Sequence, residues 1–428
     1  MLGNPTIFSL AIVEKEKERY YREDVSKRLE IFNSSRLREI YLELGDGLSI
    51  LLYFSQPSIY YEQNRGIMYI ECYPDDLMKE FEKISLDSSM RELEEVLVGI
   101  DGFFTGFIVD KSRIIFFRDH VGAIPCNYRI SDGSFMAASF KKIMNGGVGL
   151  PPGRILVWDK GSLKIHRWFR WKQLDGDRVQ ELKNRLVDVF SRYLPEYFSL
   201  SFSGGIDSTI IAFVGSLLNR SFECVTVGTE NSIDFQWAEE AASILGLRLR
   251  KVKVSMDLVK NVVEVVSRYL VNPTSMDKCI ASVYYLVATN SIDDFIVSGQ
   301  GADELFGGYY KYIKLRREKN LKYVHGVMMS DLLRLHETNI ERDYLIMTVA
   351  GRRLIQPFLA KQIFEIALST PVELKIDLED DVRKIMLRKV GEMLGIPKEL
   401  IMKPKKALQY SSGIQKLVSS MIKKPSYI

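Results

Sequence analysis

Short runs of alternating hydrophobic and polar positions, or of continuous hydrophobic positions, recur over the first 170 or so residues, as is typical of β-strands. Turn-forming stretches such as "SDGS" at residues 131–134 and "PPG" at residues 151–153 separate the runs. Such a series predicts two packed antiparallel sheets. The runs that carry the pattern are residues 5–13, 48–54, 66–73, 103–110, 112–119, 154–159 and 163–169.

The pattern changes near residue 173, where apolar residues take up helical spacing. In residues 175–194 they fall at Val179, Leu182, Leu186, Val189, Phe190 and Tyr193, and Asp177 can cap the start. Strands are then expected at residues 197–202, 222–228, 248–254 and 293–299, with helices at 208–219, 235–246 and 257–270. This alternation predicts an α/β fold with a doubly wound parallel sheet, followed from about Glu304 by a mostly helical part.

The chain has 428 residues, which is enough for two domains with separate cores. We expect them at residues 1–172 and 173–428, on either side of the change in pattern. Apolar residues make up 46% and charged residues 27%, as in soluble globular proteins. The net charge of +4 is small, so we expect no nucleic-acid partner, and the runs Glu14–Arg19 and Lys314–Lys319 are expected to be solvated helix faces.

Targeting and metal signals are weak in this sequence. There is no stretch of about 18 apolar residues and no basic leader, so we expect a cytoplasmic protein without a membrane span. The four cysteines lie far apart and only four histidines occur. Reduced, mostly buried thiols are therefore expected, rather than a disulfide framework or a zinc or histidine metal site.

The stretch "LSFSGGIDST" at residues 200–209 joins an expected strand to an expected helix. Backbone N–H groups at Ser203, Gly204 and Gly205, with the positive end of the helix dipole, would bind an anion there, and Ser208 adds a hydroxyl donor. A carboxylate beside phosphate is repulsive unless a cation lies between them. Asp207 therefore points to a nucleotide phosphate bound together with Mg²⁺.

The six residues S-G-G-x-D-S resemble the pyrophosphate loop of ATP pyrophosphatases, and a second tract makes the resemblance more specific. "SGQGADELFGGY" within Phe295–Tyr312 resembles the asparagine synthetase family. The resemblance implies an ATP-pyrophosphatase-type parallel sheet, ATP and Mg²⁺ as cofactors, and ligase chemistry. It also implies that Asp303 joins Asp207 on the metal ion.

Other residues are assigned by the same resemblance. The stretch "CVTVG" at residues 224–228 looks like the strand that holds adenine, with Val227 and Gly228 on one side of the nucleotide and Ser298 and Gly299 on the other. "KPKKALQYSSG" at residues 403–413 resembles the segment whose lysine closes over the triphosphate. Lys405 is the better match to that catalytic lysine, and Lys406 is the alternative.

The amino-terminal half also resembles this family, through "GFFTGFIVDKSRIIFFRDHVGAIPCNY" at residues 102–128. The resemblance implies a glutaminase-type αββα sandwich of the Ntn-hydrolase class. Glutamine-hydrolysing members begin Met-Cys-Gly, whereas this chain has Leu2, which cannot act as a nucleophile. We therefore expect no glutaminase activity, and a role for this domain as a scaffold or as a docking surface for a separate ammonia source.

The second half departs from the family pattern as well. Gln300 replaces a glutamate that could act as a base, and Arg353, Ile355 and Ala360 replace Glu, Arg and Asp of a second tract. These departures concern the acceptor carboxylate more than ATP. Three hypotheses follow: an ammonia-dependent ligase similar to asparagine synthetase, with aspartate as the default acceptor; a β-lactam-synthetase-like ring-forming enzyme; and a non-catalytic nucleotide-binding subunit. A homodimer is possible for each of them.

Overall fold

In the computed structural model the described residues are 7–32, 37–45, 48–55, 58–63, 66–111, 113–131, 133–159, 161–377, 382–404 and 412–422. They form two compact units. The first, here the sandwich unit, consists of described residues up to Arg170 together with His336–Leu345. The second, here the parallel-sheet unit, consists of residues 171–335 and of the described residues from Ile346 onward.

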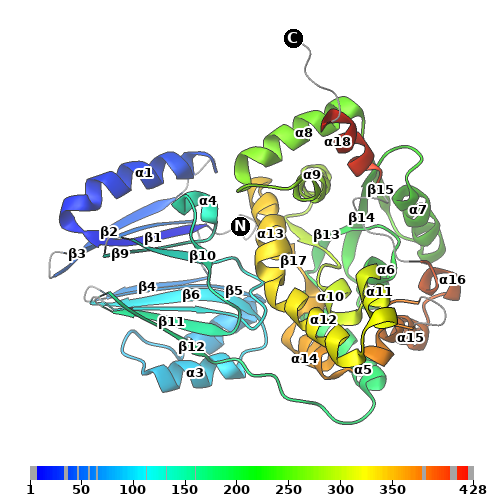
Figure 1. Ribbon diagram of the computed structural model, residues 1–428, viewed down its shortest axis with the longest axis horizontal. Coiled ribbons are helices and arrows are strands. Elements are labelled where there is room, and N and C mark those ends of the chain that lie inside the picture. Colours follow the sequence, from blue (N-terminus) through cyan, green and yellow to red (C-terminus); the bar gives the residue numbers. More distant parts are fainter. Residues whose placement is uncertain are drawn as a thin grey trace. The chain divides into compact units, whose positions relative to one another are not determined.

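The sandwich unit contains two antiparallel sheets of six strands each, as the alternating pattern predicts (Figure 1). One sheet has the spatial order β10 (Val148–Gly149), β8 (Asn127–Ser131), β9 (Ser134–Ala138), β1 (Phe8–Glu14), β3 (Leu48–Phe54) and β2 (Arg38–Gly45). The other has the order β12 (Ser162–Arg167), β11 (Arg154–Asp159), β7 (Arg113–Arg118), β6 (Phe103–Asp110), β5 (Gly66–Tyr73) and β4 (Ile59–Gln63).

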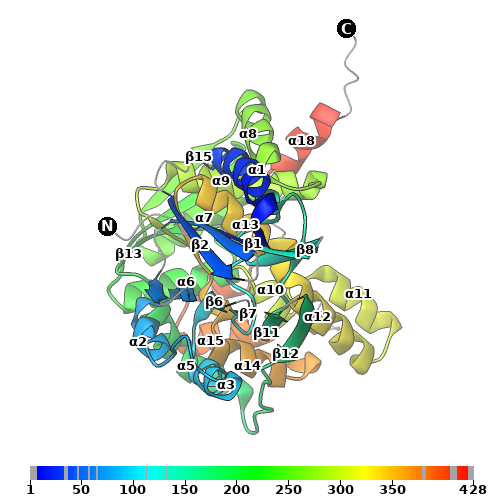
Figure 2. The same ribbon diagram turned by 90° about the vertical axis from the view of Figure 1, so that its left-hand side faces the viewer.

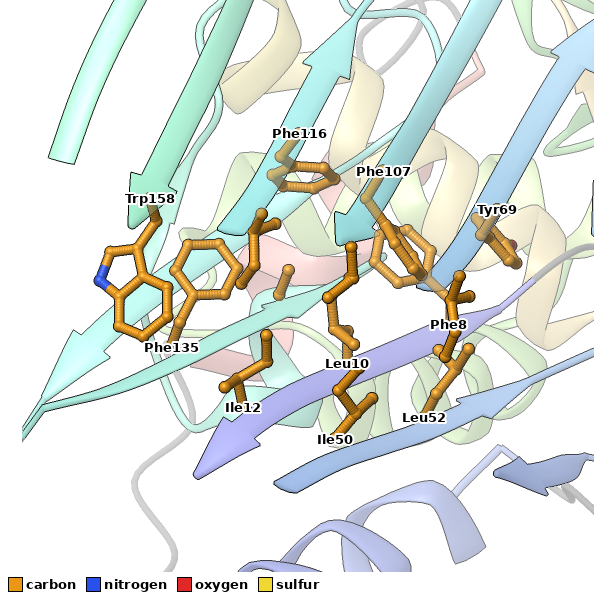
Figure 3. Close-up of a cluster of buried hydrophobic side chains, with 14 of the residues drawn as sticks. Phe8, Leu10, Ile12, Ile50, Leu52, Tyr69, Phe107, Phe116, Phe135 and Trp158 are labelled. Atoms are coloured by element: carbon orange, nitrogen blue, oxygen red, sulfur yellow. The ribbon is translucent and has the colours of Figure 1, made fainter. Parts of the chain in front are cut away.

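The core of this unit lies between the two sheets, where alternate residues of each strand point inward. Figure 3 shows Phe8, Leu10 and Ile12 of β1 facing aromatic side chains of the other sheet, including Tyr69 and Phe107. Tyr69 and Phe107 are stacked with their ring centroids 5.0 Å apart. The central strands β1, β3, β5 and β6 are buried on both faces, so burial does not alternate along them.

Short helices complete the sandwich unit. The helix α1 contacts β1 and β3, and the aromatic ring of Phe81 in α2 packs on Phe104 and Phe117 of the other sheet. The helices are η1 (Lys15–Lys17), α1 (Glu18–Glu30), η2 (Asp75–Leu77), α2 (Met78–Phe81), α3 (Met90–Gly99), α4 (Lys141–Met144) and the π-helix η3 (His336–Ile340).

The segment His336–Leu345 packs in the sandwich unit although it lies far along the sequence. The carboxylate of Glu341, at the start of α13 (Glu341–Val349), accepts hydrogen bonds from Asn127 Nδ2 at 3.3 Å and from the Lys141 backbone N at 3.2 Å. The Tyr344 hydroxyl donates to Glu71 Oε1 at 2.7 Å. The segment thus makes polar contacts with two separate parts of the sandwich unit.

The parallel-sheet unit is built on five parallel strands, in agreement with the predicted α/β pattern. Their order is β15 (Leu249–Lys253), β14 (Ser221–Gly228), β13 (Tyr197–Ser201), β16 (Phe295–Val297) and β17 (Arg353–Ile355). From β13 the chain first adds strands on one side and then, from β16, on the other. The direction therefore reverses between β13 and β16, which is where doubly wound sheets bind ligands.

Helices surround this sheet (Figure 1). The helices α6 and α7 contact β14 on the path from β13 to β15, while α9 contacts β14 and β15 on the path back to β16. The helices are α5 (Arg178–Tyr193), α6 (Ile206–Leu217), α7 (Ile233–Leu245), α8 (Met256–Tyr269), α9 (Ser275–Asn290), α10 (Ala302–Phe306), α11 (Tyr310–Glu318), α12 (Leu321–Leu335), η4 (Pro357–Leu359), α14 (Lys361–Ser369), η5 (Val372–Leu374), α15 (Ile385–Leu394), α16 (Lys398–Ile401) and α18 (Ile414–Ile422).

In the sandwich unit, the strands β2, β4, β8, β9 and β10 were not among the seven runs singled out in the sequence. In the parallel-sheet unit, two elements differ from the expectation. The strand β17 lies in the region predicted to be helical, because three residues joined to β16 by a parallel ladder leave too short a pattern to detect. The helix α9 was not singled out, although Thr274 and Asp277 form a capping box at its start. Within the described residues, no helix combines the length and the apolar character needed to cross a membrane.

Candidate active site

The loops that follow β13 and β16 lie side by side at the carboxyl edge of the parallel sheet. Leu200 pairs with Val297 in the ladder between these strands, so the two strands end at the same level of the sheet. Gly299 approaches Asp207 so closely that a Cβ atom at position 299 would lie 2.8 Å from Asp207 Cβ. The two tracts identified in the sequence therefore meet at one place, the switch point.

The loop Ser203–Ser208 is a tight turn, in which the Ser203 N–H donates to Ser208 Oγ at 3.4 Å. Gly204 has a φ of +67°, and a side chain there would overlap the backbone carbonyl of Trp237. Ser208 Oγ donates to the Gly205 carbonyl oxygen at 3.1 Å, and Ser203 Oγ accepts from Gly205 N at 3.4 Å. Because α6 begins directly after Gly205, its first N–H groups and its dipole are directed into this loop.

Asp207 and Asp303 are brought together by a third residue, Lys384. The Lys384 ammonium lies 2.5 Å from Asp207 Oδ2 and 2.5 Å from Asp303 Oδ1. Its side chain is fully buried, whereas those of the two aspartates are 14% and 20% exposed. The site therefore gathers two carboxylates around one cation at the mouth of the anion-binding loop.

Lys384 is a site residue that the sequence reasoning missed. It precedes α15 with a left-handed φ of +59°, and the Arg388 guanidinium holds the neighbouring turn by donating to the Arg383 carbonyl at 2.7 Å. Arg388 also donates to the Lys403 carbonyl at 3.0 Å. In sequence Lys384 looks like a lysine at the start of an amphipathic helix, and no local signal distinguishes it from a surface residue.

Lys403 is a second cation close to the loop. Its ammonium donates to the Trp237 carbonyl at 3.2 Å, the same carbonyl that faces Gly204, and pairs with Glu240 at 3.1 Å. The predicted lysines Lys405 and Lys406 lie outside the described residues. Beyond them, the Ser412 carbonyl accepts from Thr229 N at 3.0 Å, directly after β14.

The remaining predicted binding residues lie along the same edge. Val227 and Gly228 end β14, and Ser298 follows β16, where its N–H donates to the Ile355 carbonyl at 3.0 Å. Gln300 is half-buried, and its backbone N donates to Ser298 Oγ at 3.4 Å. The structure therefore places Val227, Gly228, Ser298, Gly299 and Gln300 at the carboxyl ends of their strands.

Gln356 is a further residue at this edge that the sequence reasoning did not single out. It follows the last residue of β17, and its side chain is 3% exposed. Within the described part of the chain, its amide nitrogen Nε2 has no hydrogen-bond partner. Because a buried donor is costly to leave unbonded, Gln356 is a candidate contact for an acceptor molecule.

Arg353, Ile355 and Ala360 replace charged residues of the family's second tract, and they are not all near the carboxyl edge of the sheet. Arg353 begins β17 opposite Phe295, with its guanidinium carbon 5.5 Å from the Phe295 ring centroid, and so lies at the amino end of the strands. Ile355 and Ala360 are buried apolar residues. Ile355 lies beside the switch-point loops, because its carbonyl accepts from the Ser298 N–H.

Glu304 lies behind the site, next to Asp303. Burial and the neighbouring Asp303 charge raise the pKa of Glu304 to about 7. The Tyr309 hydroxyl donates to Glu304 Oε1 at 2.6 Å, and burial raises the pKa of Tyr309 well above its usual value. This hydrogen bond joins the short helix α10, which carries Asp303, to the start of α11.

The four cysteines do not contribute to this site. Cys72, Cys126, Cys224 and Cys279 are all buried and free. Burial raises the pKa of Cys126 and of Cys279 to about 11 and raises that of Cys224 further. Their thiols are therefore poor nucleophiles. Leu2 lies outside the described residues.

Two solved structures give measures of overall likeness. The glutamine phosphoribosylpyrophosphate amidotransferase of B. subtilis has a TM-score of 0.32 at 10% identity and covers 65% of this chain and 96% of its own. The NMN synthetase of Francisella tularensis has a TM-score of 0.31 at 15% identity and covers 59% and 88%. Likeness at this level is too low to support an argument about this chain.

Curated relatives are more similar in sequence. A provisionally named glutamine-hydrolyzing asparagine synthetase 1 of Methanocaldococcus jannaschii is 29% identical over an alignment of 400 positions, and the match covers 77% of this chain and 73% of that protein. Asparagine synthetase B of Escherichia coli is 25% identical over an alignment of 352 positions, and the match covers 75% of this chain and 62% of that protein. The corresponding shares for the enzyme of Sandersonia aurantiaca, 26% identical, are 74% and 65%.

A family model described as Asparagine synthase matches residues 197–323 and 316–424. These residues include every strand of the parallel sheet and both switch-point loops. Because the match extends over more than half of the 428 residues, this chain belongs to the asparagine synthase family.

Proposed function

We propose that this protein is an ATP-dependent ligase that converts a carboxylate into an amide through an acyl-adenylate. The observation that carries the proposal is the convergence of Asp207, Asp303 and Lys384 beside the anion-binding loop at the start of α6. A carboxylate pair next to an anion-binding turn suits a nucleotide triphosphate bound with a divalent cation. Membership of the asparagine synthase family supports the same chemistry.

The proposed reaction has two balanced steps. A carboxylate oxygen of the acceptor bonds to the α-phosphorus of ATP while the bridging bond to the β-phosphate breaks, which releases pyrophosphate. Ammonia then bonds to the acyl carbon, the bond to the AMP oxygen breaks, and one ammonium proton passes to water. Little acid–base catalysis is required, which is consistent with the neutral amide of Gln300 at this edge.

The binding residues have separate roles in this proposal. Ser203, Gly204, Gly205 and Ser208 hold the pyrophosphate part through backbone N–H groups and hydroxyls. The cations Lys384 and Lys403, with Lys405 or Lys406, stabilise the negative charge that develops on the phosphates. Val227 and Gly228 contact the adenine on one side, and Ser298 and Gly299 on the other.

Asp207 and Asp303 also fit a magnesium ion. Both residues offer carboxylate oxygens, which are the ligands that Mg²⁺ prefers. Both carboxylates also form an ion pair with the Lys384 ammonium, so the site attracts positive charge. When bound, Mg²⁺ would neutralise phosphate charge. We assign Asp207 and Asp303 as the residues that would hold it.

The acceptor is aspartate by family resemblance, but the edge of the sheet presents uncharged amides at Gln300 and Gln356.

The nitrogen source is free ammonia, or ammonia from a partner, because none of the four cysteines has a thiol suited to attack an amide. Glutamine alone should therefore yield no glutamate. Clear glutaminase turnover by the pure protein would contradict this part of the proposal.

The test is to follow pyrophosphate release from Mg·ATP in the presence of ammonium and a panel of carboxylates. Release together with an amide product supports the ligase. Release that requires a carboxylate bearing its own amine, without ammonium, would instead indicate ring closure of the β-lactam-synthetase kind. ATP binding without pyrophosphate release under any condition would indicate a non-catalytic subunit.

Asp207→Asn provides the matched variant, since it removes the charge and keeps the shape. We expect pyrophosphate release to fall at least about 100-fold, because the lost interaction is made with the reacting phosphates. Asp257→Asn, at an exposed position on α8, is the control and should keep full activity. Retained turnover in Asp207→Asn would remove Asp207 from the site.

A further inference from the structure

The positive charge of this chain is concentrated in one short hairpin. Residues 310–323, which form α11 and the start of α12, contain six lysines and arginines and one glutamate, a net charge of +5. The whole chain has a net charge of +4, so the rest of it carries a net charge of −1. The helices α11 and α12 pack side by side and are seen together in Figure 2.

Five of the six cations of this hairpin are exposed, and Arg316 is half-buried. Lys311 pairs with Asp331 at 2.6 Å, but the ammonium of Lys314 lies over the ring of Tyr310 at 5.5 Å, and that of Lys319 over Tyr323 at 6.0 Å. Tyr310 and Tyr323 are themselves 46% and 50% exposed. Exposed tyrosines with ordered cations are typical of binding surfaces, since they offer contact area and charge at low entropic cost.

The hairpin begins directly at the reaction site. The Gly308 N–H donates to the Asp303 carbonyl at 2.8 Å, and the Gly308 carbonyl accepts from the Arg383 guanidinium at 3.0 Å. The Arg383 guanidinium carbon is 5.9 Å from the ring centroid of Tyr310, and its neighbour Lys384 pairs with Asp303. The basic surface thus starts at Arg383 and Tyr310, and the nine residues of α11 extend it by about 14 Å.

We infer that this surface, formed by Tyr310, Lys314, Lys319 and Tyr323, docks an acidic polypeptide that carries the acceptor carboxylate. The inference rests on the proposed function, which requires a carboxylate to form the acyl-adenylate. An acidic polypeptide supplies both that group and the negative charge, whereas a nucleic acid supplies only the charge. An extended peptide covers about 14 Å with four residues, so acidic side chains near the reacting one would reach the surface.

The test uses the full chain and a fluorescent peptide of about twenty glutamates at low salt, where charge attraction is strongest. Lys314→Glu/Lys319→Glu reverses two charges of the surface, and Lys260→Glu/Lys398→Glu makes the same change in net charge at exposed positions elsewhere. We expect Kd to rise at least about tenfold in the first variant and less than about twofold in the second. Equal weakening in both variants would overturn the inference.

Two further measurements separate the alternatives. A single-stranded oligonucleotide of equal charge that binds more tightly than the peptide, through the same two lysines, would overturn the inference in favour of a nucleic acid. Wild-type protein should release pyrophosphate with an acidic peptide at a kcat/KM at least about tenfold above that with free aspartate. Peptide binding without such release, in a protein that turns over small carboxylates, would also overturn it.

Failure of the proposed function has a different signature. In that case wild-type protein releases no pyrophosphate with any carboxylate, small or peptidic, whatever the binding result. If the charge-reversed variant fails to fold by circular dichroism, Lys314→Gln/Lys319→Gln provides a milder change. An unchanged Kd in that folded variant would likewise overturn the docking surface.

Discussion

At the scale of single residues, the buried ammonium of Lys384 is what holds Asp207 and Asp303 together. Two carboxylates that both contact one ammonium group would repel each other if that cation were removed. The lysine is 177 positions away from Asp207 in sequence, and it reaches the site because α15 starts next to the switch point. A lysine that looks ordinary in sequence therefore becomes part of the site.

We expect Lys384→Met to destabilise the protein by about 3–5 kcal/mol when measured in EDTA, because two partly buried carboxylates lose their partner. Added Mg²⁺ should restore more stability to this variant than to wild type, since the metal ion replaces the missing charge. Urea unfolding with and without MgCl₂ measures both effects. Lys389→Met, at an exposed position of α15, is the control, and wild-type stability of Lys384→Met in EDTA would contradict the expected role.

Lys375 provides a prediction about pH. It is 4% exposed, and burial lowers the pKa of its amine from 10.5 to about 7. As the pH falls from about 10.5, the unfolded chain takes up a proton that the folded chain binds only near pH 7. The free energy of unfolding should therefore rise with pH in this range, with a contribution from Lys375 on the order of 5 kcal/mol.

Lys375→Met removes this contribution. The variant should be more stable than wild type near pH 7, and the difference should shrink toward pH 10. Urea unfolding at about pH 7, 8.5 and 10 measures the difference, and Lys398→Met, at an exposed lysine, should show no such trend. A difference that stays constant with pH would mean that Lys375 is charged in the folded protein.

At the scale of elements, the strand-to-helix turn after β13 depends on one glycine. Gly204 has a positive φ, and a side chain there would overlap the Trp237 carbonyl. We expect Gly204→Ala to lose about 1–3 kcal/mol of unfolding free energy and most ATP affinity, because the loop N–H groups move. Urea unfolding and calorimetric titration with ATP measure these effects.

Gly326 on α12 is a matched control for this substitution. A Cβ atom at this position meets nothing within 4 Å, and the residue lies within a helix. Gly326→Ala should therefore stabilise the protein by about 0.5–1 kcal/mol and leave ATP binding unchanged. Equal effects of the two substitutions would show that the turn tolerates a side chain.

The elements themselves could largely be predicted from the sequence. The alternation from β13 to β15 and the capped helix α5 follow from local pattern, since each has a clear apolar period. The strand β17 could not, because its three residues depend on pairing with β16. Lys384 and Gln356 were missed for a related reason. Lys384 reaches the site because α15 begins there, and Gln356 because it follows β17, and neither position can be inferred from neighbouring residues in the sequence.

At the scale of the whole molecule, the return of His336–Leu345 to the sandwich unit ties the two halves of the sequence together. Glu341 is the main polar anchor, with hydrogen bonds to Asn127 and Lys141 N and an ion pair to Lys141 Nζ at 3.2 Å. Its side chain is 14% exposed. A division of the chain at a single boundary would separate this segment from the sheets that it contacts.

We expect Glu341→Ala to destabilise the sandwich unit by about 2–3 kcal/mol, because two donors lose their acceptor. Hydrogen exchange of the amides in β8, β9 and α4 measures this locally. Glu337→Ala, in the same segment but 43% exposed at its side chain, should change stability by less than about 0.5 kcal/mol. Unchanged protection of α4 in Glu341→Ala would show that the segment is not an anchor.

The sequence by itself determined the two kinds of sheet and the two loops that carry Asp207 and Asp303. These depend on local periodicity and on short tracts whose residues are neighbours in the chain. Only the tertiary structure decided that the loops meet at the switch point, that Lys384 lies between the carboxylates, and that His336–Leu345 completes the sandwich unit. The reason is physical: these contacts join residues far apart in sequence, and the stability that selects them comes from packing and charge pairing in the folded chain.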